Sequence, residues 1–137
     1  MASDTNTTDN KALEYLSRVN REKIDRIYAA VIYELAVKNR CTEPKLTAAT
    51  LAKEFGVSTR IFSAVMNLRF NTSFNNVLNH YRILQVTYMM KDSRNKELSC
   101  DDIAFACGFS NHMTFYTAFK HEIGKTPSVF RNETQTF

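Results

Sequence analysis

The chain has 137 residues, of which 44% are hydrophobic, so it can form one compact unit or two very small ones and is too apolar for wholesale disorder. Its three glycines and two prolines favour helix over sheet, and its net charge of +4 leaves a modest basic excess for a polyanionic partner. The three cysteines lack the spacing of a disulfide framework or of a zinc site, so we expect no disulfide, bound metal or cofactor. The first ten residues hold no secretory signal, and the longest apolar run (27–33) is too short to span a membrane. We therefore expect a cytoplasmic protein.

The N-terminal part of the chain is predicted to be a tail followed by a helix. Residues 1–9 are rich in Thr, Asn, Asp and Ser and are expected to be flexible. Residues 10–40 form a helical segment, because no Pro or Gly occurs from 11 to 38 and apolar residues recur at helical spacing (Ile24, Tyr28, Val31, Leu35). We expect an interruption near Asn20. The stripe upstream of it (Leu13, Leu16, Val19) would either pair two copies into a homodimer through residues 11–35 or fold back.

A turn-centred pattern occurs twice in the chain, 52 residues apart, with glycines at positions 56 and 108. The first copy, residues 41–72, predicts a short helix over 48–54 capped by Thr47, a turn at Gly56, and a second helix over 59–69 capped by Ser58 and ended by Asn71. Two short capped helices joined by a glycine turn are the signature of a helix-turn-helix, whose second helix fits the major groove of DNA.

The second copy lies within residues 93–131 and is predicted to be built in the same way. Ser99 caps a helix through 106, Gly108 turns the chain, and Ser110 caps a helix to about residue 122. After Gly124, the pair Thr126-Pro127 opens a short terminal helix to about residue 131, and 132–137 is a tail. The linker helix between the copies, within 73–92, is predicted to bury one stripe (Phe74, Val77, Leu78, Tyr81, Leu84, Tyr88 and Met89 or Met90).

The segment 108–131 resembles the C-terminal signature of the AraC/XylS-type transcription regulators. Its glycine, aromatic and proline positions match in register over 24 consecutive residues, from Gly108-Phe109-Ser110-Asn111 to Phe130-Arg131. The first copy and Tyr81-Arg82-Ile83 are similar to the first half of the same family. The resemblance implies an all-α fold with two helix-turn-helix subdomains joined by a long central helix, and recognition helices that enter adjacent major grooves. A central helix of ~18 residues would be ~27 Å long, which suits grooves ~34 Å apart.

The resemblance also implies which side chains of the second recognition helix approach DNA bases. Phe115 and Phe119 lie on one face and are expected in the core. The opposite face carries the base-contacting candidates His112, Met113, Tyr116 and Thr117. His and Thr can hydrogen-bond base edges, and Met and Tyr can contact a thymine methyl group. The family often has Arg where Thr117 stands, so strong guanine recognition is not implied at that position.

In the first recognition helix, Ile61, Phe62 and Val65 are expected in the core, and the outward-facing candidates for base contact are Thr59, Arg60, Ser63 and Asn67. Arg60 is the leading candidate for a guanine or phosphate contact. Ala64 occupies a position where the family often has Arg or another polar residue that contacts bases. This copy departs from the family pattern more than the second does.

Phosphate contacts are expected from helix N-termini and nearby donors, namely Ser58, Ser110, Asn111, Lys120 and Thr126. The stretch between Glu54 and Asp92 contains basic residues but no acidic one, which suits a polyanion or a solvated basic face. Within it, Arg82 could instead form an internal salt bridge.

These patterns predict a sequence-specific transcription regulator that binds double-stranded DNA and is not an enzyme. Its further partners would be RNA polymerase or a fused or separate regulatory domain. Two alternatives remain open. One is an architectural DNA-bending protein of the recombination or excision type, with weak base recognition; the other is a helical protein-interaction module.

Overall fold

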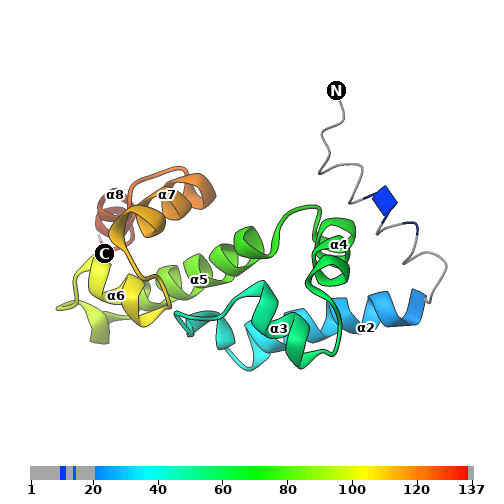
Figure 1. Ribbon diagram of the computed structural model, residues 1–137. Helices are drawn as coiled ribbons and strands as arrows, with labels where there is room; N and C mark the ends of the chain where they lie inside the picture. The colour runs from blue at the N-terminus through cyan, green and yellow to red at the C-terminus, as the bar shows by residue number, and fades with distance from the viewer. Residues whose placement is uncertain (1–9, 12–13, 15–20, 136–137) are drawn as a thin grey trace. The chain divides into compact units, whose positions relative to one another are not determined.

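The computed structural model describes residues 10, 11, 14 and 21–135, and this part of the chain is helical and contains no strand, which confirms the predicted all-α class (Figure 1). The predicted N-terminal tail and the stripe of Leu13, Leu16 and Val19 lie outside the described residues. The chain forms two compact units. The first takes in the described residues up to Lys38 together with Leu46–Val77, and the second contains Asn39–Lys45 and the chain from Leu78 onward.

The first unit contains the first helix-turn-helix and a longer helix packed against it. Helix α2 (Arg21–Ile32) continues as a π-helical turn, η1 (Tyr33–Val37), and packs on α4 (Thr59–Phe70), which follows α3 (Ala48–Glu54). The predicted caps of these short helices are confirmed, because the hydroxyl oxygens of Thr47 and Ser58 accept hydrogen bonds from backbone N–H groups three residues ahead. Asn71 ends α4 in the left-handed conformation, as its position predicts.

Phe62 lies at the centre of the first unit and is fully buried. Its ring packs against Phe55 and Phe74 at centroid distances of 6.1 and 5.5 Å. Phe55 follows α3 and Phe74 begins α5 (Phe74–Lys91). One side chain of α4, Phe62, therefore packs against both the end of α3 and the start of α5. This packing fixes which face of α4 points inward and leaves the opposite face to solvent.

The central helix α5 begins in the first unit and continues through the second, and its predicted buried face is partly wrong. Phe74, Val77 and Leu78 are buried as expected, but Leu84 and Tyr88 are 49% and 70% exposed. The buried stripe continues instead along Ile83 and Val86 and ends at Met90, one of the two methionines predicted for it. The two stripes have the same helical spacing and similar apolarity, so periodicity alone does not distinguish them; packing against the second helix-turn-helix does.

The second unit contains α6 (Cys100–Ala106), α7 (His112–Ile123) and α8 (Pro127–Thr134). Two helix boundaries differ from prediction. Asn111, not Ser110, is the N-cap of α7, because its side-chain oxygen accepts from Thr114 N–H at 2.8 Å. Helix α8 runs three residues beyond residue 131, to Thr134, and Gln135 N–H still bonds to the carbonyl of Arg131.

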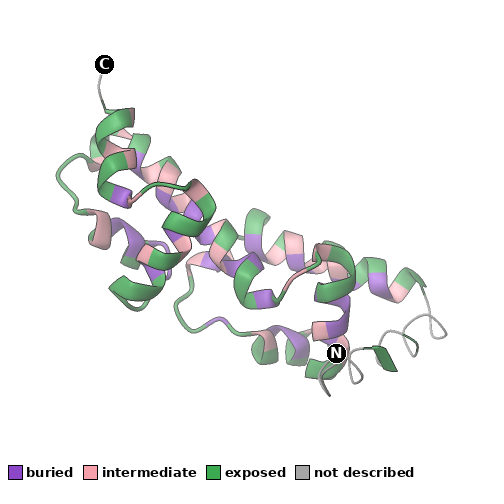
Figure 2. Cartoon of the chain, turned by 90° about the horizontal axis from the view of Figure 1, so that it is seen from above, coloured by how far each residue is buried: buried purple, intermediate pink, exposed green. Residues whose placement is uncertain are grey.

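The core of the second unit is a row of aromatic rings. Phe115 and Phe119, both fully buried, contact each other at 5.8 Å between centroids, which confirms their predicted core positions. Phe109 extends the row at one end and Phe130 of α8 at the other. Colouring by burial shows helices with a buried side and an exposed side (Figure 2).

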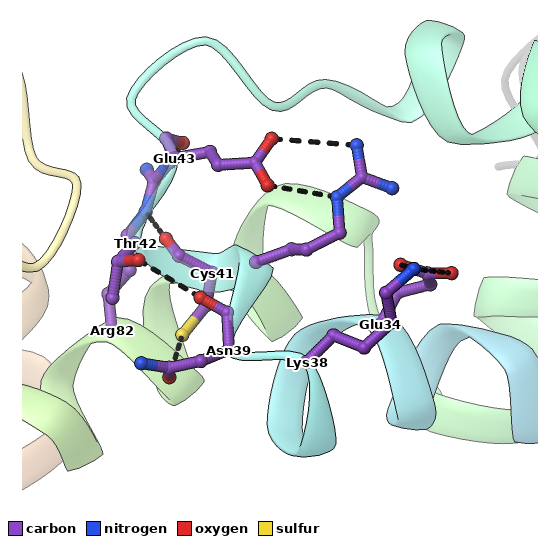
Figure 3. A network of polar contacts seen from close by, with 8 residues as sticks. Glu34, Lys38, Asn39, Cys41, Thr42, Glu43 and Arg82 are labelled. Atoms are coloured by element: carbon purple, nitrogen blue, oxygen red, sulfur yellow. Dashed lines mark hydrogen bonds and ion pairs between the residues drawn. The ribbon is translucent and has the colours of Figure 1, made fainter.

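Arg82 is buried in the second unit and ties the loop 39–45 to helix α5 (Figure 3). Its Nε donates to the carbonyl oxygen of Cys41 at 2.6 Å and its Nη2 to that of Glu43 at 2.8 Å. The guanidinium also lies over the Phe109 ring, 5.7 Å from its centroid. Arg82 therefore satisfies its charge with backbone carbonyls and an aromatic face, and not with the internal salt bridge that the sequence suggested.

Position 108, beside Arg82, has room only for a glycine. Its φ is +105°, and a Cβ built there would lie 2.7 Å from both Arg82 Nε and the Cys41 carbonyl oxygen. Gly56 and Gly124, which turn the chain elsewhere, also have positive φ, but a Cβ at either position would meet nothing within 4 Å. Because of these contacts, the loop 39–45 belongs to the second unit. The predicted division, which begins the first helix-turn-helix at residue 41, does not anticipate them.

Candidate nucleic-acid interface

The second helix of the second helix-turn-helix, α7, exposes side chains beside its buried phenylalanines. His112, Met113 and Thr117 are exposed and Tyr116 is half-buried. These four positions follow one another at helical spacing, so they share one face of α7. The structure therefore places all four candidates where a ligand can reach them.

His112 is held in a defined orientation on this face. It is the first residue of α7, directly after the cap Asn111, and its Nδ1 lies 2.8 Å from a carboxylate oxygen of Asp101 in α6. Its ring also packs at a tilt against Tyr116, with centroids 5.8 Å apart. Nothing in the sequence pairs Asp101 with His112, because the two residues are brought together by the turn between helices.

The first recognition helix, α4, exposes a smaller set of its candidates. Thr59 and Arg60 are exposed at its N-terminal end, and Arg60 makes no hydrogen bond or ion pair with the described residues. Ser63 is half-buried. Asn67 is exposed, but its amide Nδ2 donates to the carbonyl oxygen of Ser63 at 3.1 Å, which engages one of its two N–H groups.

Ala64 is not in the position of a residue that contacts bases. It is 1% exposed and lies in the core beside Val65 and Met66. Phe62 and Val65 are buried as predicted, whereas Ile61 is only half-buried. The outward face of α4 is therefore narrower than that of α7, because the core covers three consecutive residues.

Three of the five candidates for phosphate contact use their side-chain oxygens as helix caps. Ser58, Asn111 and Thr126 accept hydrogen bonds from backbone N–H groups at 3.1, 2.8 and 3.3 Å. Ser110 is exposed, with its hydroxyl outside the cap of α7, and Lys120 is exposed on the recognition helix. The three caps use their side-chain oxygens as acceptors, so the hydroxyl protons of Ser58 and Thr126 and the amide N–H groups of Asn111 can still be donated.

The basic stretch between residues 54 and 92 is partly neutralised inside its own units. Arg69 pairs with Asp25 at 2.5 Å, and Arg82 is buried on carbonyl oxygens. Lys91 is exposed, with its ammonium 5.9 Å from the Phe130 ring centroid. Among the basic residues of this stretch, Arg60 is the one that is exposed at the start of a recognition helix.

Other kinds of site find little support in the described residues. No group of three or more His, Cys, Asp or Glu side chains there could hold a metal ion. None of the helices in this part of the chain combines the length and apolarity that a membrane span requires.

Comparison with known proteins finds a family match that extends into both units. Residues 51–133 match a family model described as a helix-turn-helix domain. The Msm operon regulatory protein of Streptococcus mutans is 31% identical over 85 residues, and the HTH-type transcriptional activator RhaS of Escherichia coli is 28% identical over 81 residues. These segments cover 62% and 59% of this chain but only 30% and 28% of the relatives, so the matched region is less than a third of either relative.

Two solved structures share the fold. The C-terminal domain of AraT, a response regulator from Geobacillus stearothermophilus, superposes with a TM-score of 0.66 at 22% identity and covers 85% of this chain and 88% of that one. A protein of unknown function from Listeria innocua gives a TM-score of 0.64 at 21% identity and covers 72% of this chain and 90% of that one. At this level of identity the similarity concerns the fold alone.

Proposed function

Because the chain belongs to the AraC-type family of helix-turn-helix domains, we propose that it is a transcription regulator that binds specific sites on double-stranded DNA. Each recognition helix, α4 and α7, would enter a major groove, and the two grooves would be adjacent on one duplex. Bases would be recognised through the exposed faces of the helices, and phosphates through Ser110, Lys120 and the helix N-termini.

The observation that carries this proposal is the polar, exposed face of α7. A recognition helix contacts base edges with residues near its N-terminus, and His112, Met113, Tyr116 and Thr117 are gathered there. Phe115 and Phe119, both fully buried, fix the helix in the core. The helix is thus rigidly seated, with hydrogen-bonding and apolar groups directed away from the protein. The first unit repeats the design through α4, with Thr59 and Arg60 exposed at its start.

Selection of bound duplexes from a random pool tests the proposal. We expect an enriched site with two half-elements about one helical turn, ~10 base pairs, apart. At fixed salt, the enriched duplex should bind ~10³-fold or more tightly than random duplex. Lys120→Ala should weaken binding to both duplexes alike and make the salt dependence shallower by about one unit of slope. A pool that yields no enriched sequence would contradict specific recognition.

One observation favours architectural DNA binding as a second candidate. The face of α4 is poor in base-contacting groups, because Ala64 is buried, Ser63 is half-buried and Asn67 is partly engaged. A protein that relies on phosphate contacts and DNA deformation would need few base-contacting groups on its recognition helices. In that case the affinity ratio between enriched and random duplex would be only a few-fold. A protein-interaction module that does not bind DNA would instead show no salt-dependent binding to either duplex.

A further inference from the structure

Asp101 and His112 form a contact at the point where α7 would meet DNA. His112 is the first residue of the recognition helix, and 55% of its side chain is exposed. Asp101 is the second residue of α6, and its Oδ1 lies 2.8 Å from His112 Nδ1. Among the described residues, Asp101 and Tyr116 are the titratable side chains that contact the imidazole ring. The carboxylate thus engages one ring nitrogen and leaves Nε2 for a ligand.

The chemistry of the pair decides which proton the neutral imidazole keeps. An ionised carboxylate can only accept hydrogen bonds, so Nδ1 must carry the proton that it donates to Asp101. In a neutral imidazole, the other nitrogen then has a free lone pair and acts as an acceptor. In the neutral ring, His112 Nε2 is therefore an acceptor as long as Asp101 holds Nδ1.

An acceptor in the major groove distinguishes between bases. Adenine N6 and cytosine N4 carry amino groups that donate hydrogen bonds there, whereas guanine offers N7 and O6 and thymine offers O4, all acceptors. A lone pair at His112 Nε2 would attract the first two and be repelled by guanine. The identity of the favoured base thus depends on a residue outside the recognition helix.

We propose that Asp101 is a positioning residue that fixes the Nδ1–H tautomer of His112, so that Nε2 selects an adenine or cytosine amino group over guanine at the base it meets. This inference rests on the proposed function, because it assumes that α7 enters the major groove. It goes beyond that function in assigning a base preference and the residue that sets it. Replacement of Asp101 should therefore alter recognition at one base position and leave the other positions unchanged.

The first arm of the test uses the full chain without DNA. Nitrogen-15 NMR of the histidine rings at about pH 9, where imidazoles are neutral, should show His112 protonated at Nδ1 in the native chain. In Asp101→Ala the Nε2–H form should become dominant. Asp101→Asn, whose amide can either accept or donate, should give a mixture. A native chain with His112 protonated mainly at Nε2 would overturn the proposal.

The second arm measures base preference on duplexes derived from the enriched site, with each position varied in turn. The native chain should prefer adenine or cytosine over guanine by about tenfold at one position, equivalent to ~1.4 kcal/mol, and Asp101→Ala should reduce this to within about twofold. The matched control is Glu122→Gln, because Glu122 contacts Nδ1 of His80 at 3.1 Å in the same unit but lies away from the start of α7. That variant should keep the native preference.

The two arms separate this inference from the function on which it rests. An Asp101→Ala chain that retains the tenfold preference overturns the role of Asp101, even if the native tautomer is as expected. A native chain that selects no duplex overturns the proposed function, and with it the base preference, while the NMR arm still reports the tautomer.

Discussion

Substitution of Gly108 by alanine should destabilise the second unit much more than the same substitution at Gly124. Both glycines have positive φ, +105° and +83°, and both lie in the second unit. They differ in their surroundings. A Cβ at 108 would lie 2.7 Å from Arg82 Nε and from the Cys41 carbonyl oxygen, whereas a Cβ at 124 would meet no atom within 4 Å.

The size of the difference follows from these contacts. Holding an alanine at positive φ costs about 1–2 kcal/mol at either site. At 108 the new methyl group must also push Arg82 away from the carbonyl of Cys41, and a hydrogen bond from a charged group contributes about 1.5–3 kcal/mol. We therefore expect Gly108→Ala to lower the free energy of unfolding by about 2.5–5 kcal/mol and Gly124→Ala by about 1–2 kcal/mol.

Equilibrium urea unfolding followed by circular dichroism measures both losses. Hydrogen exchange of peptides from α6 and α7 would show that the loss in Gly108→Ala falls in the second unit. If the two alanine variants lose the same stability, the close approach of Arg82 and the Cys41 carbonyl to Gly108 does not constrain the unit, and the reasoning is wrong.

Three further predictions concern the core, the thiols and acid stability. Phe119→Ala should lower the free energy of unfolding by about 3–5 kcal/mol, since the ring is fully buried; a silent substitution in urea unfolding would mean that the buried face of α7 is misassigned. Burial raises the pKa of the Cys107 thiol to about 12. Because the thiolate is the nucleophile, iodoacetamide at about pH 8 should label half-buried Cys100 well before Cys107. Equal rates of labelling of the two cysteines, measured by peptide mass spectrometry, would contradict this. Hydrogen bonds from Arg94 lower the pKa of Asp92 to about 2, so this carboxylate contributes stability above about pH 4 that is lost as the pH falls towards 2. The urea midpoints of the native chain and Asp92→Asn should converge over that range. A difference between the two midpoints that stays constant with pH would contradict a stabilising contact between Asp92 and Arg94.

Local chemistry predicted most helix boundaries, because a cap depends on neighbours three residues away. Thr47 and Ser99 cap their helices as the sequence indicates. The error at α7 has a local cause as well. Ser110 and Asn111 are adjacent and both are good caps, so the residue type does not decide between them. The backbone does, because Asn111 takes the extended conformation from which its side chain reaches Thr114 N–H.

Features that depend on distant parts of the chain were not predicted. Arg82 binds the carbonyl oxygen of a residue 41 positions away, and no motif marks that partner. Asp101 and His112 are 11 positions apart and meet only because the turn brings the starts of two helices together. The sequence indicated the kind of each side chain on the candidate interface, but the orientation of His112 and the burial of Ala64 came from tertiary packing.

We propose that α4 and α7 contact one duplex at two successive places. Missing-base interference on the enriched duplex measures this directly, because it shows at which bases removal weakens binding. We predict two clusters of sensitive bases about 10 base pairs apart, with Arg60→Ala abolishing the sensitivity of one cluster and His112→Ala that of the other. A single cluster, or two variants that affect the same bases, would contradict the claim.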